Sequence, residues 1–444
     1  MKPSRDKSAN RRRVATLVAA ERMEAIRLSD AIADLAEPGF KEDESSRLLS
    51  QYLSARGFAV EFPWKPMPTA FKATWGRGKP SIGLLAEYDA LPNCGPRESD
   101  YGHGCGHNLL GVGAAVGAVA AAGMLRQAGL DGQIVLWGCP AEELVAGKVY
   151  MARDGAFRCN DAILGWHPGG ANAVGRSGHA AIDSMLFEFF GRTAHGSHAH
   201  NGRSALDGVI LLDVAANYLR EHIPENVRIH MCIRHGGDAP NVVPAYAKAW
   251  YYVRGKDRQQ VDDVRRRLVK CARGAALATE TKVQAKRLTG CYHRLRNEIL
   301  GDLVEANFKL FGPLTVTAED RKRVRQAGKK PEFAAGLPAG PESQSRGSSD
   351  EDNVSWLAPF TRFSVACVSK GTAAHHRDYA AQVKWPFAHR GMLRAAEILG
   401  VTAFELCADA ALLARARDEF RKGTRGFVYD PLVTPKQKPP AECP

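Results

Sequence analysis

Three side chains that can bind a metal ion alternate with glycines in the segment YGHGCGHN at residues 101–108. His103, Cys105 and His107 occupy every second position, and side chains two residues apart project to the same side of an extended backbone. The glycines between them permit bends that bring two or three of these side chains to one ion. Thiolate and imidazole groups suit ions of the Mn, Fe and Zn class. The spacing therefore predicts a metal site, with a glycine-rich turn of incidental composition as the structural alternative.

Two adjacent carboxylates follow the apolar run QIVLWGC, in the segment CPAEE at residues 139–143. Glu142 and Glu143 cannot both point the same way, so one can coordinate a metal ion while the other takes a proton from metal-bound water. Acidic residues also suit the first turn of a helix, and Gly147-Lys148 would continue such a helix. Taken alone, the pair leaves the functional and the structural interpretation open.

Three further histidines follow predicted strands. His167 ends the apolar run AILGW, and His375 and His376 come after the run SVACV and the turn KGT. The carboxyl ends of strands are where α/β enzymes place their sites. An isolated histidine at such a position is more often structural, and only one of the adjacent pair can comfortably face a shared ion. Each is therefore a candidate ligand, with a solvated or structural role as the alternative.

Another group of polar residues lies in the middle of the chain. His195, His198 and His200 share the segment GRTAHGSHAH, which could bind a metal ion, contact a substrate or form a solvated loop. Asn241, within GGDAPNVVP, and Arg254 are candidates for holding a substrate carboxylate.

The bulk composition indicates a globular protein of two domains. The chain has 444 residues, of which 45% are hydrophobic and 25% charged. No apolar run approaches the ~20 residues that a membrane helix requires, and charged residues at positions 21, 22 and 24 break the first apolar stretch, so it is no signal-peptide core. We expect a cytoplasmic location without a membrane partner. The ten cysteines are scattered, which favours free thiols and a metal ligand over disulfides.

The formal net charge of +13 is compatible with a nucleic-acid partner or with an anionic small substrate. The basic clusters at residues 11–13 and 321–330 contain no interleaved aromatic side chains, and no nucleic-acid-binding motif is present in the sequence. A basic surface that serves a small carboxylate-bearing substrate is the favoured interpretation.

Strands and helices alternate in the first part of the chain, which indicates an α/β layer with a substantially parallel sheet. The segment from residue 13 to 56 is helical with an interruption at Glu37-Pro38-Gly39. The other elements predicted there are strands at 81–86, 133–139 and 162–166 and a helix at 108–125.

The pattern changes near residue 182 to strand, helix, strand, strand, helix, strand, which is the ferredoxin-like order. Helical character returns from residue 297, followed by a Pro/Gly/Ser-rich loop at 329–349, a strand at 361–367 and helices at 384–399 and 401–422. We therefore expect an α/β domain formed by residues 1–181 and 293–444, with an inserted domain at 182–292.

Taken together, these residues resemble the M20 metallopeptidase family, most closely its aminoacylase-like amidohydrolase branch. The similarity runs over nearly the whole chain. It is carried by EPGF with Glu42, AEYDALP, GHGCGHNLLG, PAEE, ILGWHP, FFGRTAHGSHAHNGRSALDG, APNVVP, GSSDEDNVSW and KGTAAHH. The resemblance implies a zinc-peptidase-like α/β catalytic domain in two chain segments and an inserted ferredoxin-like α+β domain that serves as a lid and dimerises.

The resemblance also implies roles for individual residues. Cys105 matches the bridging ligand of one or two divalent ions, Mn²⁺ or Zn²⁺, and the other ligands match His107, Glu143, His167 and His375. Glu142 matches the general base, and His195 matches the lid histidine that stabilises the oxyanion. The residues expected to contact substrate are Asn241, Arg254, His198 and His376. Two departures from the family pattern are Asn108, where Asp is frequent, and His376, where a small residue is usual.

The implied reaction is hydrolysis of the amide bond of an N-acyl or N-aroyl amino acid by a metal-activated water, in a homodimer or larger assembly. The same centre could displace ammonia from an aromatic amine such as a nitro-aminobenzoate, as part of aromatic compound catabolism. A non-catalytic metal- or ligand-binding protein is a further alternative, which the intact Glu142-Glu143 pair argues against.

Overall fold

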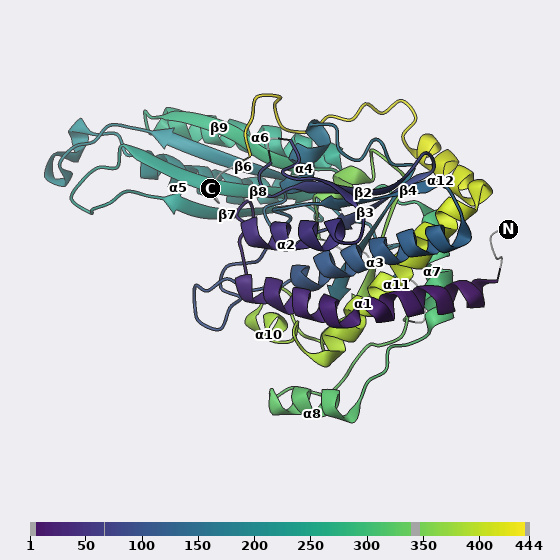
Figure 1. Cartoon of the computed structure of the whole chain (residues 1–444). Helices are drawn as coiled ribbons and strands as arrows, with labels where there is room; N and C mark the ends of the chain where they lie inside the picture. Colours follow the sequence, from purple (N-terminus) through teal and green to yellow (C-terminus); the bar gives the residue numbers. More distant parts are fainter. Residues whose placement is uncertain (1–5, 66, 339–346, 440–444) are drawn as a thin grey trace. The chain divides into compact units, whose positions relative to one another are not determined.

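The computed structural model describes residues 6–65, 67–338 and 347–439, and the chain forms two compact units. The first unit comprises Met1–Gly178, Leu295–Gln344 and Val354–Tyr429, and the second comprises His179–Arg294, Ser345–Asn353 and Asp430–Pro444. Figure 1 traces the chain through both units.

A six-stranded sheet forms the centre of the first unit. Its strand order is β1-β2-β4-β3-β5-β10, in which β3, β4, β5 and β10 are parallel and the pairs β1–β2 and β2–β4 are antiparallel. The strands are β1 (Ala59–Glu61), β2 (Phe71–Arg77), β3 (Ser81–Ala86), β4 (Gly132–Gly138), β5 (Ala162–Gly169) and β10 (Phe360–Ala366). All six residues of β3 are buried, which explains its uninterrupted apolar sequence. The parallel strands end together at one edge of the sheet.

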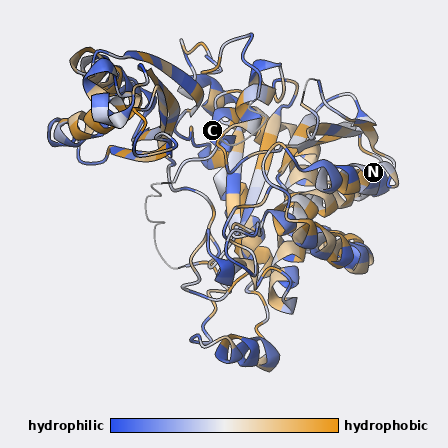
Figure 2. Ribbon diagram, turned by 90° about the vertical axis from the view of Figure 1, so that its left-hand side faces the viewer, coloured by the Kyte–Doolittle hydropathy of each residue, from blue (hydrophilic) through white to orange (hydrophobic). Residues whose placement is uncertain are grey.

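Helices cover this sheet and supply the other half of the core. The helices of this unit are α1 (Lys7–Leu35), α2 (Asp43–Ser54), α3 (His107–Ala128), α4 (Gly147–Arg153), α7 (Glu298–Phe311), α8 (Ala318–Gln326), α10 (Arg377–Ala380), α11 (Pro386–Ala408) and α12 (Ala410–Gly423). The short α9 (Glu351–Val354) lies where the two units meet in sequence. Figure 2 shows the central strands as apolar, whereas α8, lowest in that view, is hydrophilic.

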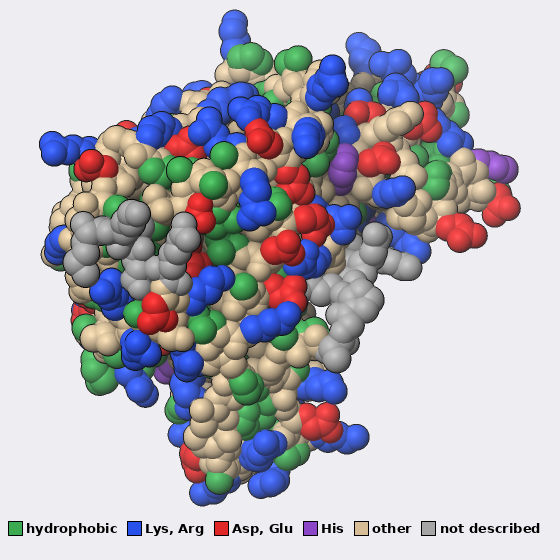
Figure 3. Space-filling view, turned by 90° about the vertical axis from the view of Figure 1, so that its right-hand side faces the viewer, with side chains coloured by type: hydrophobic (Ala, Val, Ile, Leu, Met, Phe, Trp, Pro, Cys, Tyr) green, Lys and Arg blue, Asp and Glu red, His purple; other side chains and the backbone are tan. Residues whose placement is uncertain are grey.

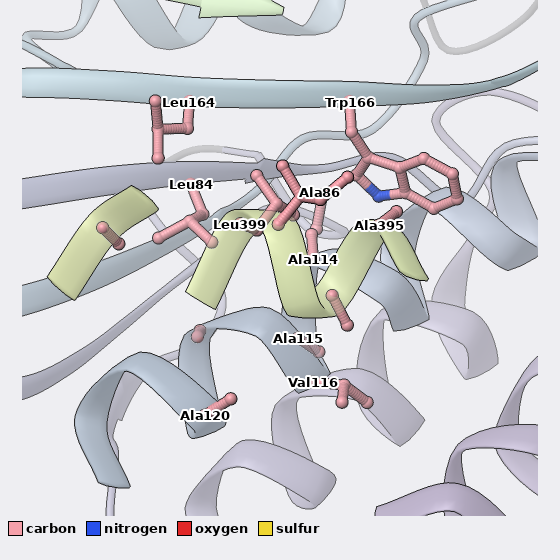
Figure 4. Packing of buried hydrophobic residues seen from close by; sticks show 14 of the residues in the cluster. Leu84, Ala86, Ala114, Ala115, Val116, Ala120, Leu164, Trp166, Ala395 and Leu399 are labelled. Atoms are coloured by element: carbon pink, nitrogen blue, oxygen red, sulfur yellow. The ribbon is translucent and has the colours of Figure 1, made fainter. Parts of the chain in front are cut away.

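The core of the first unit depends on small residues in α3. Figure 4 shows Leu84 of β3 and Trp166 of β5 close to Ala114 of α3 and Ala395 of α11. The indole Nε1 of Trp166 donates a hydrogen bond to the carbonyl oxygen of Leu110 at 2.9 Å, so the ring lies flush against α3. The alanines and glycines of α3 therefore reflect close packing between helices and sheet.

The apolar character of α3 corrects one expectation. This 22-residue helix has a mean hydropathy of 1.8 over its most apolar stretch, and among the described residues it alone is long and apolar enough to cross a membrane. The expectation that no run approaches that length is therefore wrong. Because 89% of the stretch is buried inside the protein, its hydropathy is accounted for by core packing.

The second unit is built on a four-stranded antiparallel sheet with the order β7-β8-β6-β9. Its elements are β6 (Ala181–Phe190), α5 (Ala205–Leu219), β7 (Arg228–His235), β8 (Tyr246–Gly255), α6 (Arg258–Ala278) and β9 (Lys282–Cys291), with short 3-10 helices η1 (Gly196–Asn201) and η2 (Arg220–His222). Residues along β8 alternate between buried and half-buried, as expected for a sheet with one face on a core. Both the element order and the strand order are ferredoxin-like.

The predicted fold class is confirmed: an α/β sheet unit accompanies a ferredoxin-like α+β unit. Some details were wrong or missed. The predicted helix break near Gly400 does not occur, because α11 continues to Ala408. A Cβ at Gly400 would lie 2.9 Å from Val14, so this glycine serves close helix packing and not a turn.

The antiparallel strand β2 was not predicted. The predicted loop at 329–349 lies partly outside the described residues.

The nine cysteines within the described ranges are all free thiols, in agreement with the sequence. On the face shown in Figure 3, Lys and Arg side chains are scattered among Asp and Glu. The basic character of the chain is thus distributed over this face.

The packing of α3 on Trp166 gives a testable consequence for stability. A Cβ at Gly113 would lie 2.6 Å from Cζ2 of the indole ring. We expect Gly113→Ala to lower the free energy of unfolding by about 1–3 kcal/mol through overpacking, although alanine is the better helix former. Gly301→Ala in α7 is the control, since its nearest contact would be an ordinary 3.6 Å, and it should leave stability unchanged or slightly raised. Urea denaturation measures both, and equal stabilities of the two variants would contradict the account.

Candidate metal centre

Five chain segments bring ionisable side chains to the carboxyl edge of the parallel strands in the first unit. Glu87 and Asp89 follow β3, and Glu142-Glu143 follow β4. His167 lies near the end of β5, and His375 follows β10. Cys105 and His107 lie at the start of α3. The parallel sheet therefore places residues from distant parts of the sequence at one edge.

The side chains predicted as ligands from the resemblance lie together there. Sγ of Cys105 is 3.3 Å from Nε2 of His167. Nε2 of His375 is 3.4 Å from Oε2 of Glu143, whose Oε1 is 3.9 Å from Nε2 of His107. Two overlapping sets, Cys105-His107-His167 and Cys105-Glu143-His375, each have ligand atoms within 4.8 Å of one another. Glu142 lies beside them, with Oε2 at 4.0 Å from Nε2 of His107.

The histidines are oriented by their second ring nitrogens. Nδ1 of His107 donates to Oδ1 of Asp89 at 2.8 Å, and Nδ1 of His167 donates to the carbonyl oxygen of Pro168 at 2.6 Å. Each contact engages Nδ1 and leaves Nε2 directed at the cluster, which is the arrangement found in histidines that bind metal ions. His375 adopts a left-handed conformation with φ of 58°, and its backbone N–H donates to the carbonyl oxygen of Gly104 at 2.9 Å.

Two buried carboxylates hold the loop that carries Glu142. Oε1 of Glu42 accepts the backbone N–H of Ala141 at 2.7 Å, and Oδ2 of Asp89 accepts that of Glu143 at 2.9 Å. Ala141 has a φ of 55°, a conformation that costs free energy for a residue other than glycine. Oε2 of Glu42 also accepts a hydrogen bond from Thr69 at 2.8 Å. The backbone on both sides of Glu142 is therefore fixed.

The electrostatics of the cluster fit a divalent cation. Burial raises the pKa of the Cys105 thiol and raises the pKa of Glu143 well above its usual value, with Glu142 adding repulsion. Burial opposes charge on His107, but the carboxylate of Asp89 outweighs it and raises the pKa of His107. Nε2 of His107 and Oε1 of Glu143 are buried without a hydrogen bond of good geometry to another described residue. A cation would neutralise the crowded acids and satisfy these atoms.

His103 does not join the cluster. The segment forms a turn at Gly104-Cys105 and enters α3 at His107, so the extended geometry assumed for three alternating side chains is wrong. Nε2 of His103 contacts the carbonyl oxygen of Ile32 at 3.1 Å, and Nδ1 accepts the N–H of Asn108 at 3.2 Å. Burial lowers the pKa of His103 to about 4. It is a neutral histidine that joins α1 to the turn.

The two departures from the family pattern have local explanations. The amide of Asn108 donates to the hydroxyl of Ser29 at 3.0 Å and points away from the ligands. The ring of His376 accepts the backbone N–H of Asp378 at 3.1 Å and thereby caps α10.

In the second unit, three of the four predicted residues lie together. The carbonyl oxygen of Asn241 accepts the backbone N–H of Gly196 at 2.7 Å, next to His195. The rings of His195 and His198 have centroids 6.3 Å apart, and neither is buried. Arg254 lies near the opposite end of β8, eight residues beyond Tyr246 and about 26 Å away at the usual rise per residue. The structure does not bring Arg254 to the His195 loop of the same unit.

Sequence reasoning assigned no role to Glu87, Asp89 and Lys148. Glu87 and Asp89 lie in AEYDALP directly after a strand, a position that could have identified them. Nothing in the sequence indicated a role for Lys148 in the site, because a lysine is rarely as fully buried as it is here.

Comparison with known proteins identifies the family. A model described as a peptidase dimerisation domain matches residues 174–280. A p-aminobenzoyl-glutamate hydrolase chain of Escherichia coli is 33% identical, over 93% of this chain and 95% of that protein. The human Xaa-Arg dipeptidase is 30% identical, over 91% of this chain and 89% of that protein. A dinuclear metal-binding peptidase of the M20 family from Bacillus subtilis shares the fold, with a TM-score of 0.57 at 18% identity over 86% of this chain and 98% of that chain.

These relatives and the fold define the class of protein: a metal-dependent hydrolase that acts on C–N bonds. The chain belongs to the M20 metallopeptidase family, and the resemblance drawn from the sequence is confirmed.

The buried carboxyl of Glu42 gives a pH prediction. Burial and the nearby Asp89 raise the pKa of Glu42 to about 8, from an ordinary value of 4.5. Between these values the folded protein holds a proton that the unfolded chain releases, so Glu42 makes the free energy of unfolding fall as pH rises, by at most roughly 1.4 kcal/mol per pH unit. In Glu42→Gln this slope should be flatter, while glutamine still accepts the Ala141 N–H. Urea denaturation of the metal-free proteins from pH 5 to pH 8 measures the free energy of unfolding at each pH. The same dependence on pH in wild type and in Glu42→Gln would refute the prediction.

Proposed function

We propose that this protein hydrolyses the amide bond of an N-acyl or N-aroyl amino acid, releasing a carboxylic acid and a free amino acid. The observation that carries the proposal is the convergence of a thiol, three imidazoles and a carboxylate beside Glu142. The names of the relatives, an aminobenzoyl-glutamate hydrolase and a dipeptidase, support an amide substrate that carries a carboxylate.

The proposed ligands of one or two Mn²⁺ or Zn²⁺ ions are Cys105, His107, Glu143, His167 and His375. A divalent ion held by them would supply Lewis-acid chemistry, which lowers the pKa of bound water to near 7 and polarises a carbonyl group. The protein's own contribution is the fixed geometry described above, in which Asp89 orients His107 and the backbone at Glu143.

Glu142 is the proposed general base and later the general acid. Its side chain is 12% exposed, so it can reach a substrate while remaining largely shielded from bulk water. It takes a proton from the attacking water and delivers a proton to the leaving nitrogen, which a carboxylate can do when its loop is held in place. Glu42 and Asp89 supply that constraint through the backbone.

We assign the second unit the role of a lid that also dimerises, in agreement with the peptidase dimerisation match. Nδ1 of His195 accepts the backbone N–H of Ser197 at 3.1 Å, so the ring proton resides on Nε2 and can be donated to an oxyanion. His198, Asn241, Arg254 and His376 remain the proposed substrate contacts. Because Arg254 lies near the end of β8 and Asn241 lies in the loop before its start, they would contact a substrate in different ways or from different subunits.

A substrate panel tests the proposed function. Metal-loaded protein should release free amino acid from N-acyl or N-aroyl amino acids, including an aroyl-glutamate. In Glu142→Gln the turnover should fall by about 10²–10⁴-fold at unchanged metal content, because the proton acceptor is lost but the proposed ligands remain. Chromatography of the products and elemental analysis of the protein measure both quantities.

Two outcomes would contradict the proposal. Ammonia release from amino-benzoates, without hydrolysis of any amide in the panel, would assign the centre to aromatic amines. Full activity of Glu142→Gln would remove Glu142 from the mechanism.

A further inference from the structure

We propose that Glu87 is an additional ligand of the metal centre and that Lys148 holds it in place. The inference rests on the proposed metal-dependent function and extends the ligand set beyond the five residues that the family resemblance supplies. It comes from the geometry at the end of β3.

Glu87 is the first residue after β3, and its side chain is 3% exposed. Oε2 of Glu87 lies 3.5 Å from Nε2 of His107, the ring nitrogen directed at the cluster. The ligand atoms of Glu87, His107 and Glu142 all lie within 4.8 Å of one another. A carboxylate oxygen therefore occupies the space in front of a proposed ligand nitrogen.

The distance between Oε2 of Glu87 and Nε2 of His107 is similar to the distance between two atoms that bind the same ion. Ligand atoms about 2.1 Å from one ion, at angles between octahedral and tetrahedral, are about 3.0–3.4 Å apart. The Glu87–His107 separation of 3.5 Å is close to this range. It is comparable to 3.3 Å for Cys105–His167 and 3.4 Å for His375–Glu143. Nε2 of His107 lies farther from the other two glutamates, at 4.0 Å from Oε2 of Glu142 and 3.9 Å from Oε1 of Glu143.

Lys148 explains how this carboxylate is held. Nζ of Lys148 lies 2.7 Å from Oε1 of Glu87, and the lysine side chain is fully buried. Burying an ammonium group is costly unless it is paired, and Glu87 supplies a paired carboxylate. One oxygen of Glu87 thus faces Lys148 and the other faces His107. Hydrogen bonding of a ligand carboxylate by a second residue is a common feature of metal sites.

The added carboxylate also bears on which ion the site prefers. Thiolate and imidazole groups suit Zn²⁺, whereas carboxylate oxygens suit harder ions such as Mn²⁺. With Glu87 the set contains two carboxylates, Glu87 and Glu143. We therefore choose Mn²⁺ as the probe, because its binding should depend most on Glu87.

The test compares Mn²⁺ binding by metal-free wild-type protein and by Glu87→Gln, using calorimetry and the electron paramagnetic resonance signal of free Mn²⁺. We expect Glu87→Gln to raise the apparent Kd for Mn²⁺ by roughly 10–100-fold or to lower the number of bound ions. Asp161→Asn is the matched control. Asp161 is also a largely buried carboxylate paired with a lysine, Lys79, but it precedes β5 at the opposite edge of the sheet. This control should bind Mn²⁺ as the wild type does.

A second variant covers the case in which Glu87→Gln does not fold. Glu87→Asp keeps a carboxylate for Lys148 but withdraws it from His107 by one carbon–carbon bond, about 1.5 Å. Weaker Mn²⁺ binding by Glu87→Asp, at unchanged stability of the metal-free protein, supports a ligand. Wild-type affinity and stoichiometry in either folded variant would overturn the inference and make the Glu87–Lys148 pair purely structural. If wild-type protein itself bound neither Mn²⁺ nor Zn²⁺, the proposed metal-dependent function would fail instead.

Discussion

The crowding of acidic groups at a buried sheet edge is the constraint on which the rest of the site depends. Glu87, Asp89 and Glu143 lie within a few ångströms of His107, and burial disfavours the charged forms of Glu143 and Cys105. Lys148 compensates one carboxylate, and His107 partly compensates another. The remaining acids are costly to ionise unless a cation lies among them. A divalent ion would turn this repulsion into a source of affinity, which is why the cluster points to metal-dependent chemistry.

Hydrogen bonds to the backbone hold the segments that carry these acidic groups. Asp89 orients His107 and also accepts the N–H of Glu143, so one carboxylate couples two segments of the site. Glu42 holds Ala141 in a left-handed conformation, and Gly104 pairs with the backbone of His375. These contacts come from loops that the parallel sheet brings together. Glu42 and Asp89 therefore fix the backbone on both sides of Glu142.

Much of this arrangement could be predicted from the sequence, and the exceptions have physical causes. The glycine-rich segment indicated Cys105 and His107 because ligand-capable residues were closely spaced. The same spacing wrongly placed His103 on the side of the ligands, because the chain turns at Gly104 and enters a helix instead of remaining extended. A single sequence does not reveal such a change of backbone direction. The break expected at Gly400 failed for a related reason: tertiary packing against Val14 overrode the local preference of glycine.

Pairings between distant segments were the hardest to foresee. Lys148 neutralises Glu87, 61 positions earlier in the chain, and no local pattern signals that contact. Arg254 and Asn241 are both polar residues of the inserted segment, but Arg254 lies near the end of β8 and Asn241 in the loop before its start. Motif spacing thus identified chemical types, whereas the sheet topology determined which of them meet.

The central claim, that a thiolate and imidazoles from separate segments bind one centre, is tested most directly by X-ray absorption spectroscopy of the zinc-loaded protein. We predict a sulfur scatterer at about 2.3 Å from the zinc ion together with nitrogen or oxygen scatterers at about 2.0–2.2 Å, and loss of the sulfur contribution in Cys105→Ser. A wild-type spectrum with nitrogen and oxygen scatterers alone, unchanged in Cys105→Ser, would contradict it.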